Sequence, residues 1–260
     1  MTARLLSAVT TCLLSIWAMS VPARAGDVPI IAAASDLQFA VTEIAQTFEA
    51  QTGYAVRLNF GSTGNFARQI REGAPFDVFM AADESYVLDL AQDGLTRDDG
   101  SVYAEGRIVL IAPHGSTLSV DDGMNGLADA LAQGRIKHFA IANPDHAPYG
   151  VRAMEALKHR HLWEQLQPML VLGENVSQAA QFATTGNAEG GIIAYSLALA
   201  PQVSALGSYI LIPADWHAPL RQRMVLLKNA GPEAEAFFAF MNSPQARTIM
   251  ETYGFNRPEE

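Results

Sequence analysis

Hydroxyl and glycine residues gather immediately before an expected helix in the stretch 60-FGSTGNFARQI-70. The hydroxyls of Ser62 and Thr63 and the first backbone amides of a helix are all hydrogen-bond donors. A phosphate-binding P-loop would have lysine after its second glycine, whereas Asn65 and Phe66 follow here. The stretch therefore predicts an anion site made of neutral donors and excludes a Walker-type nucleotide site.

Alternating strand and helix patterns must position these donors. Short apolar runs predict strands, and apolar residues at a 3.6-residue period predict helices between them. The expected strands are 28–34, 54–60, 76–81, 107–113, 139–142, 169–172, 191–195 and 223–227. The expected helices are 37–52, one after 61–65, 84–92, 149–160, 177–184, 232–241 and 244–253. This order predicts an α/β fold with doubly wound, mostly parallel sheets.

Polar residues stand at several of the points where an expected strand passes into a helix. In open α/β sheets, ligands bind beyond the carboxyl ends of strands, where helices begin with free N–H groups and a partial positive charge. The junctions are 32-AAASDLQ-38, 61-GSTGN-65, 143-NPDHAPYGV-151 and 173-GENVSQAA-180. Ser, Thr, Asp or Asn before one helix is an ordinary N-cap, as we expect for Ser196. The coincidence of several such junctions favours a shared binding site.

Residues 1–25 have the features of a secretory signal peptide. Arg4 is followed by an apolar run, and Ala23-Arg24-Ala25 forms an A-x-A cleavage signal. We expect cleavage after Ala25 and a soluble protein in the periplasm. Cys12, the only cysteine of the sequence, lies in this segment, so the mature chain can form no disulfide or zinc-cysteine site.

The charge of the chain limits its partners. The net charge is −10 at pH 7, and removal of residues 1–25, which contain two arginines and no acidic residue, makes it more negative. An acidic protein is a poor partner for nucleic acid and for anionic membrane surfaces. We therefore expect that the protein binds neither nucleic acid nor an anionic membrane surface. The length of the mature chain suits one large domain or two lobes.

Four segments resemble the periplasmic molybdate-binding proteins of ABC importers, and they span nearly the whole mature chain. They are 33-AASDL-37, 60-FGSTGNFARQIREGAPFDVFMAADE-84, 143-NPDHAPYG-150 and 248-TIMETYGF-255. The resemblance implies the type II periplasmic-binding-protein fold, with a ligand cleft between two lobes. We expect lobe 1 to comprise residues 26–107 and 220–260, and lobe 2 to comprise residues 108–219.

The same resemblance implies a set of ligand contacts. A tetrahedral molybdate or tungstate would be held by neutral hydrogen bonds from Ser35, Thr63, Tyr149 and the backbone of Val176, with Asp36 and Ser62 in the same loops. The family's ligand-contacting tyrosine in a later strand is replaced here by Ala194, so Tyr149 would supply the phenolic donor. The resemblance also implies a binding protein without a cofactor, most simply a monomer, that serves an ABC-type membrane permease.

Asp36 departs from this pattern, because related sequences commonly have asparagine there. A carboxylate beside a dianion costs energy unless it turns away or is protonated. One hypothesis is that its side chain caps the helix 37–52 while its backbone N–H faces the ligand. The other is that it accepts a proton from the ligand, which would favour phosphate or a phosphonate, since molybdate, tungstate and sulfate carry no proton at neutral pH.

A secreted serine hydrolase is the alternative from another class of protein. Ser35 or Ser62 would be the nucleophile and His146, near the predicted cleft, the base. Neither serine lies in a Gly-x-Ser-x-Gly motif. The sequence therefore favours a binding protein.

Overall fold

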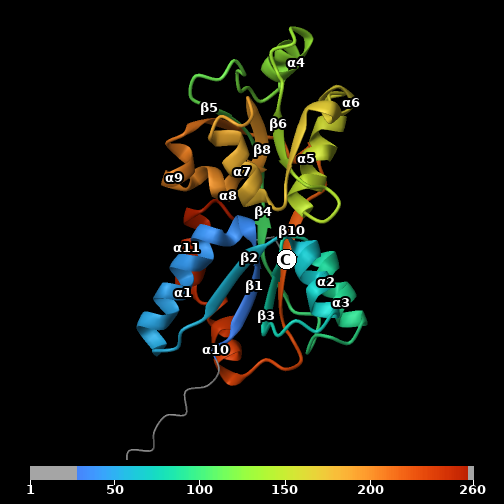
Figure 1. The fold of residues 1–260 in the computed structure, drawn as a ribbon. Helices are drawn as coiled ribbons and strands as arrows, with labels where there is room; N and C mark the ends of the chain where they lie inside the picture. The colour runs from blue at the N-terminus through green and yellow to red at the C-terminus, as the bar shows by residue number, and fades with distance from the viewer. Residues whose placement is uncertain (1–27, 257–260) are drawn as a thin grey trace, which may run out of the picture.

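The computed structural model describes residues 28–256, so the predicted signal peptide and its cleavage site lie outside the described residues. Two five-stranded sheets, each flanked by helices, form two lobes that are stacked end to end (Figure 1). The predicted two-lobed α/β architecture is confirmed. Within residues 28–256, no helix is both long enough and apolar enough to cross a membrane.

The first lobe is built on the sheet β2-β1-β3-β10-β4. Its elements are β1 (Ile30–Ala34), the 3-10 turn η1 (Ser35–Leu37), α1 (Gln38–Thr52), β2 (Arg57–Gly61), α2 (Thr63–Arg71), β3 (Val78–Ala81), α3 (Glu84–Gln92), β4 (Ser101–Gly106), β10 (Leu220–Leu226), α10 (Pro232–Met241) and α11 (Pro244–Thr252). Strand β1 pairs in parallel with β2 and β3, whereas β10 is antiparallel to β3 and β4. The carboxyl ends of β1, β2 and β3 therefore lie at one edge of the sheet.

The second lobe repeats this plan on the sheet β7-β6-β8-β5-β9. Its elements are β5 (Ile108–Pro113), α4 (Asn125–Ala132), β6 (Phe139–Ala142), α5 (Pro148–His159), α6 (Trp163–Leu166), η2 (Gln167–Met169), β7 (Leu170–Gly173), α7 (Val176–Thr184), β8 (Gly190–Ala194), α8 (Tyr195–Leu199), α9 (Pro201–Ser204), β9 (Gly207–Leu211) and η3 (Ala214–Trp216). Strand β6 is parallel to β7 and β8, and β5 is antiparallel to β8 and β9.

Two passages of the chain connect the lobes. The first runs from β4 into β5, and the second runs from β9 through η3 into β10. Figure 1 shows β4 and β10 at the junction of the two lobes. These passages lie close to the predicted boundaries, although the bounds 26–107, 108–219 and 220–260 themselves stay a prediction.

Apolar packing fixes the carboxyl edge of the first sheet. Strand β1 is buried from Ile31 to Ala34, as expected for a strand that is covered on both faces. Helix α1 packs its buried residues against this sheet and ends at Gly53, whose φ of 75° suits a C-cap glycine. The ring of Phe48 lies 5.4 Å from that of Phe237, which attaches α10 to the same core. The loop that follows β1 therefore starts from a rigid support.

Strands β4 and β9 and helices α4, α6 and α9 were not predicted, and β10 begins earlier than the predicted strand 223–227. The reason is visible in β10, whose start carries Arg221, Gln222 and Arg223. Gln222 is completely buried, while the two arginines bond to the carboxylate of Glu84. Polar side chains satisfied by distant partners concealed the strand from an analysis based on apolar patterns.

Candidate functional site

One small cavity of about 10 Å³ lies where the two lobes meet. The turn η1 and helix α2 reach it from the first lobe, and α5 and α7 reach it from the second. All six residues predicted for the site line it, namely Ser35, Asp36, Ser62, Thr63, Tyr149 and Val176. Each of them is at most 4% exposed. In the described part of the chain, no lysine, arginine or histidine lines the cavity.

Two hydroxyl oxygens in the cavity already accept hydrogen bonds from backbone amides. The Oγ1 of Thr63 accepts a hydrogen bond of 3.0 Å from the N–H of Ala82. The Oγ of Ser35 accepts one of 3.3 Å from the N–H of Ser177, across the lobes. Neither hydroxyl donates a hydrogen bond to any residue in the range 28–256. Both protons are therefore free for an acceptor in the cavity.

Helix N-termini add backbone donors. Ser62 caps α2 by accepting from the N–H of Asn65 at 3.4 Å. Asn175 caps α7 by accepting from the N–H of Gln178 at 3.1 Å, which leaves Val176 as the first helical residue. The first amides of a helix have no partner within it and carry partial positive charge. The lining thus offers neutral donors to an anion.

Asp36 and Tyr149 meet from opposite lobes. The phenol of Tyr149 donates a 2.9 Å hydrogen bond to Oδ2 of Asp36, and the amide of Gln222 donates one of 2.6 Å to the same oxygen. Tyr103 in turn donates a 2.8 Å bond to Oε1 of Gln222. In this arrangement the phenol proton is directed to Asp36, so the role predicted for Tyr149 as a donor to the ligand stays a prediction.

The predicted capping role of Asp36 is wrong. Neither η1 nor α1 has a side-chain cap, because the Asp36 carboxylate points to Tyr149 and Gln222. The capping role expected of Ser196 is also wrong, since its hydroxyl donates a 2.8 Å bond to the carbonyl of Asp36. Gln222 was missed by the sequence analysis. It could have been found as a polar residue at an inward-facing position of a strand, because buried polar side chains usually have a hydrogen-bond partner.

Burial raises the pKa of Asp36 from 3.8 to about 6, because the charged carboxylate is deprived of water. The hydrogen bonds from Gln222 and Tyr149, and a weaker interaction with the backbone N–H of Asp36 itself, oppose this shift but do not cancel it. Burial and the nearby Asp36 charge also raise the pKa values of Tyr103 and Tyr149 well above 10, so both phenols remain neutral. The second carboxylate oxygen, Oδ1, is buried without any hydrogen-bond partner.

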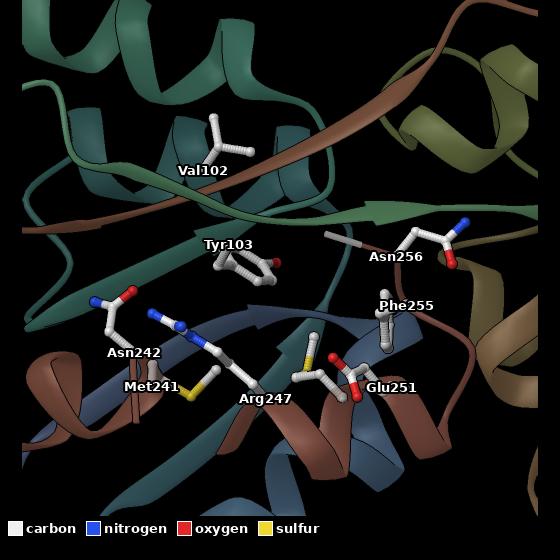
Figure 2. A pocket seen from close by; sticks show the side chains of 9 residues that line it. Val102, Tyr103, Met241, Asn242, Arg247, Glu251, Phe255 and Asn256 are labelled. Carbon is white, nitrogen blue, oxygen red and sulfur yellow. The ribbon is translucent and has the colours of Figure 1, made fainter. Parts of the chain in front are cut away.

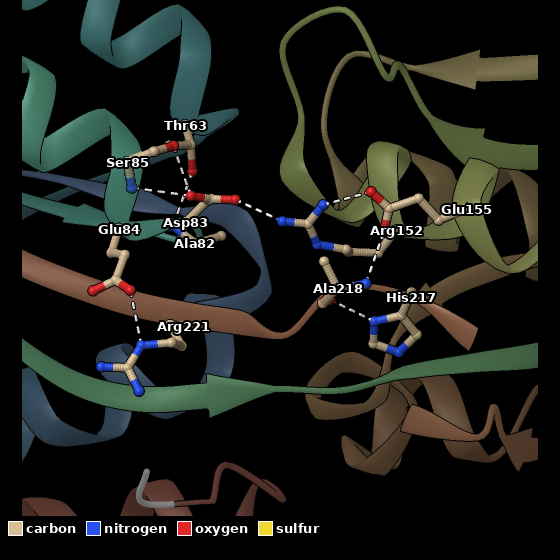
Figure 3. A network of polar contacts seen from close by, with 10 residues as sticks. All are labelled: Thr63, Ala82, Asp83, Glu84, Ser85, Arg152, Glu155, His217, Ala218 and Arg221. Carbon is tan, nitrogen blue, oxygen red and sulfur yellow. Dashed lines mark hydrogen bonds and ion pairs between the residues drawn. The ribbon is translucent and has the colours of Figure 1, made fainter. Parts of the chain in front are cut away.

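Ion pairs connect α5 to the first lobe near the cavity (Figure 3). Arg152 of α5 contacts Asp83 of the first lobe at 2.8 Å and Glu155 of its own helix at 2.9 Å. Glu155 also accepts a 2.9 Å bond from the N–H of Ala218. Asp83 directly follows Ala82, the partner of Thr63, so this ion pair lies next to the cavity lining. Its attraction favours the arrangement in which the lobes touch.

A second set of contacts crosses the lobes beside Ser62. The N–H of Gly64 donates a 2.9 Å bond to the carbonyl of His146, whose Nδ1 lies 2.9 Å from Oγ of Ser62. The Nε2 of His146 lies 3.6 Å from Glu174, which also bonds to Asn65. Serine, histidine and carboxylate thus stand in a row, as the hydrolase alternative requires. The serine oxygen, however, also serves as the cap of α2.

A larger cavity of about 60 Å³ lies within the first lobe, under β4 and beside α11 (Figure 2). Tyr103, Arg247 and Glu251 are among its lining residues. Every lining residue belongs to the first lobe, so a molecule there would contact one lobe only. In the part of the chain that the structure describes, no group of three or more His, Cys, Asp or Glu side chains is placed to hold a metal ion.

Comparison with known sequences places the chain among binding proteins. Residues 30–256 match the family model described as bacterial extracellular solute-binding protein. A molybdate-binding protein of Rhodobacter capsulatus is 36% identical over 253 residues, which is 96% of each chain. One of Azotobacter vinelandii is 36% identical over 236 residues, which cover 90% of this chain and 91% of that one.

Comparison with solved structures agrees with the sequence matches. The periplasmic molybdate-binding protein of Azotobacter vinelandii superposes with a TM-score of 0.80 at 30% identity, covering 90% of this chain and 100% of that one. A sulfate-binding protein of Mycobacterium tuberculosis has a TM-score of 0.72 at 14% identity, which indicates a shared fold alone. The matched family and the molybdate-binding relatives are binding proteins, which agrees with the expected class of binding protein and not with the hydrolase alternative.

Proposed function

Because the chain belongs to the bacterial extracellular solute-binding proteins, we propose that it captures molybdate, and equally tungstate, in the cavity between its lobes. The observation that carries this proposal is the convergence of free hydroxyl protons and helix N-termini on one buried, cation-free cavity. The molybdate-binding proteins to which the chain is similar support the choice of oxyanion. The ligand oxygens would accept from Ser35, Thr63 and the amide of Val176, and from Tyr149 after its phenol proton turns from Asp36 to the ligand.

Neutral donors suffice energetically for such a ligand. A hydrogen bond to a charged acceptor contributes about 1.5–3 kcal/mol net. Several of them together match the roughly 8–12 kcal/mol of a micromolar to nanomolar complex. Because the donors belong to both lobes, an anion that touches all of them stabilises the closed form.

The proposed setting of this activity is the periplasm. The chain would be exported, cleaved after Ala25, and recognised in its closed form as a monomer by an ABC-type permease. Amino-terminal sequencing of the mature protein tests the cleavage site, with Gly26 expected as the first residue. Small-angle scattering tests closure, since tight binding without a fall in the radius of gyration would contradict it.

Parallel calorimetric titrations test the ligand itself. The purified protein is titrated at one pH with molybdate, tungstate, sulfate and phosphate. We expect tight binding of the first two and weak or no binding of the others, because molybdate and tungstate are larger than sulfate and phosphate, and phosphate also carries a proton near neutral pH. A preference for phosphate or sulfate would contradict the proposal.

Another tetrahedral oxyanion, such as phosphate, a phosphonate or sulfate, is the second candidate. The observation in favour of phosphate or a phosphonate is the buried carboxylate of Asp36 in the cavity lining. An ionised carboxylate there would accept a hydrogen bond from a protonated ligand such as phosphate or a phosphonate. Sulfate carries no proton at neutral pH and would not gain this bond. The same titrations distinguish these candidates from molybdate.

A further inference from the structure

Asp36 is the one ionisable carboxyl in the cavity lining, and its hydrogen bonds are unevenly divided between its oxygens. Oδ2 accepts from both Tyr149 and Gln222, at 2.9 and 2.6 Å. Oδ1 is buried and has no partner among the described residues. This is the pattern of a neutral carboxyl group, in which one oxygen accepts as a carbonyl and the other carries a proton to donate.

Among residues 28–256, no positively charged side chain is bonded to Asp36. The ionisable groups that face it are the phenols of Tyr149, from α5, and Tyr103, from β4, and both are neutral. Its other polar contacts are also neutral: Gln222 of β10 bonds to the carboxylate, and Ser196 of α8 bonds to the backbone carbonyl. No arginine, lysine or histidine contributes to the shift in its pKa. A carboxylate here would face a bound dianion without any cation to offset the repulsion.

We propose that the protein takes up one proton together with the oxyanion, and that Asp36 carries this proton on Oδ1 and donates it to a ligand oxygen. The inference rests on the proposed function, because it requires a doubly charged oxyanion in this cavity. The proton comes from solvent, and the only bond formed is O–H on the carboxylate. Asp36 thereby becomes a neutral donor, like the hydroxyls of Ser35 and Thr63, and the complex carries one negative charge less.

This coupling makes affinity depend on pH. Above the pKa of Asp36 in the free protein, one proton must be bound for each ligand, so the affinity falls about tenfold for each unit that pH rises. Molybdate stays a dianion across this range and contributes no titration of its own. The site therefore selects for deprotonated tetrahedral dianions and binds them more tightly in mildly acidic surroundings.

The experiment measures proton uptake and affinity in the full mature protein. Molybdate is titrated by calorimetry at pH 7.5 and 8.5, each in two buffers with different ionisation enthalpies. For the wild type we expect uptake of about one proton and an affinity about tenfold lower at pH 8.5. Asp36→Asn, which keeps an acceptor for Tyr149 and a donor toward the ligand, should take up no proton. Its affinity should change less than about twofold between the two pH values.

A second variant separates Asp36 from the nearby histidine. His146 contacts Ser62 but does not contact Asp36, so His146→Gln should retain both the proton uptake and the tenfold change. The proton count of the wild type tests the coupling even if a variant folds poorly.

The possible outcomes are distinct. Tight binding by the wild type without proton uptake or pH dependence would overturn the inference and leave the proposed function intact. Equal pH dependence in Asp36→Asn would also overturn it, because the proton would then lie elsewhere. If neither wild type nor Asp36→Asn bound molybdate or tungstate at either pH, the proposed function would fail and this inference with it.

Discussion

Replacing Asp36 with asparagine should stabilise the unliganded protein at neutral pH. The carboxyl is 1% exposed, and its pKa rises from 3.8 to about 6 on folding. A group with a raised pKa in the folded state binds more protons there than in the unfolded chain. Its stabilising contribution is complete below the unfolded pKa and is lost as pH rises toward the folded pKa. At pH 7.5 the ionised carboxylate is therefore a net cost to folding.

The magnitude follows from the shift of about two pKa units. One unit corresponds to about 1.4 kcal/mol, so the buried carboxylate costs about 3 kcal/mol at pH 7.5 and less than about 1 kcal/mol at pH 4. Asparagine has nearly the same shape, keeps an oxygen to accept from Tyr149 and Gln222, and carries no charge. The Asp36→Asn substitution should therefore raise the free energy of unfolding by most of this amount at pH 7.5 and by almost nothing at pH 4.

Urea unfolding of both proteins between pH 4 and 8 measures this difference. At pH 7.5 the urea concentration at the unfolding midpoint should be higher in Asp36→Asn, while the dependence of the unfolding free energy on urea stays the same. The midpoints of the two proteins should become equal toward pH 4. The matched control is Asp145→Asn, at an exposed position. Its difference in midpoint from the wild type should not change between pH 7.5 and pH 4. Equal stability of wild type and Asp36→Asn at pH 7.5 would refute the reasoning, because the carboxyl would then be hydrated in the free protein.

Two further variants test the donors and the contact between lobes. Thr63→Val removes a hydroxyl donor that would contribute about 1.5–3 kcal/mol, so molybdate affinity should fall roughly 10- to 100-fold by calorimetry. Thr248→Val, on the exposed face of α11, should leave it unchanged, and an equal loss in both variants would refute the assignment. In Gly64→Ala, a Cβ would lie 2.7 Å from the carbonyl oxygen of His146 in the other lobe. This variant should bind molybdate at least about tenfold more weakly. It should also compact less on ligand addition in small-angle scattering. Compaction equal to that of the wild type would contradict a close contact between Gly64 and His146 in the liganded protein.

Local patterns in the sequence were sufficient for most of the elements and for the edges where ligands could bind. The strand 139–142 and the helix 232–241 were predicted with the bounds that the structure has. Such elements are recognisable because a continuous apolar run, or an apolar face at helical period, depends on neighbouring residues alone. The junctions before α2 and α7 were recognisable for the same reason, since a capping residue lies next to the helix that it caps.

The environment of Asp36 was decided only by the tertiary structure. Its partners are separated from it by 113 residues for Tyr149 and 186 for Gln222, and no local pattern predicts which distant side chains will meet. The sequence alone therefore determined that neutral donors would stand at the ends of strands, and suggested the class of ligand through resemblance. Folding decided that a carboxylate would be enclosed among them without a cation, because burial and hydrogen-bond pairing are properties of the packed lobes and not of any one segment.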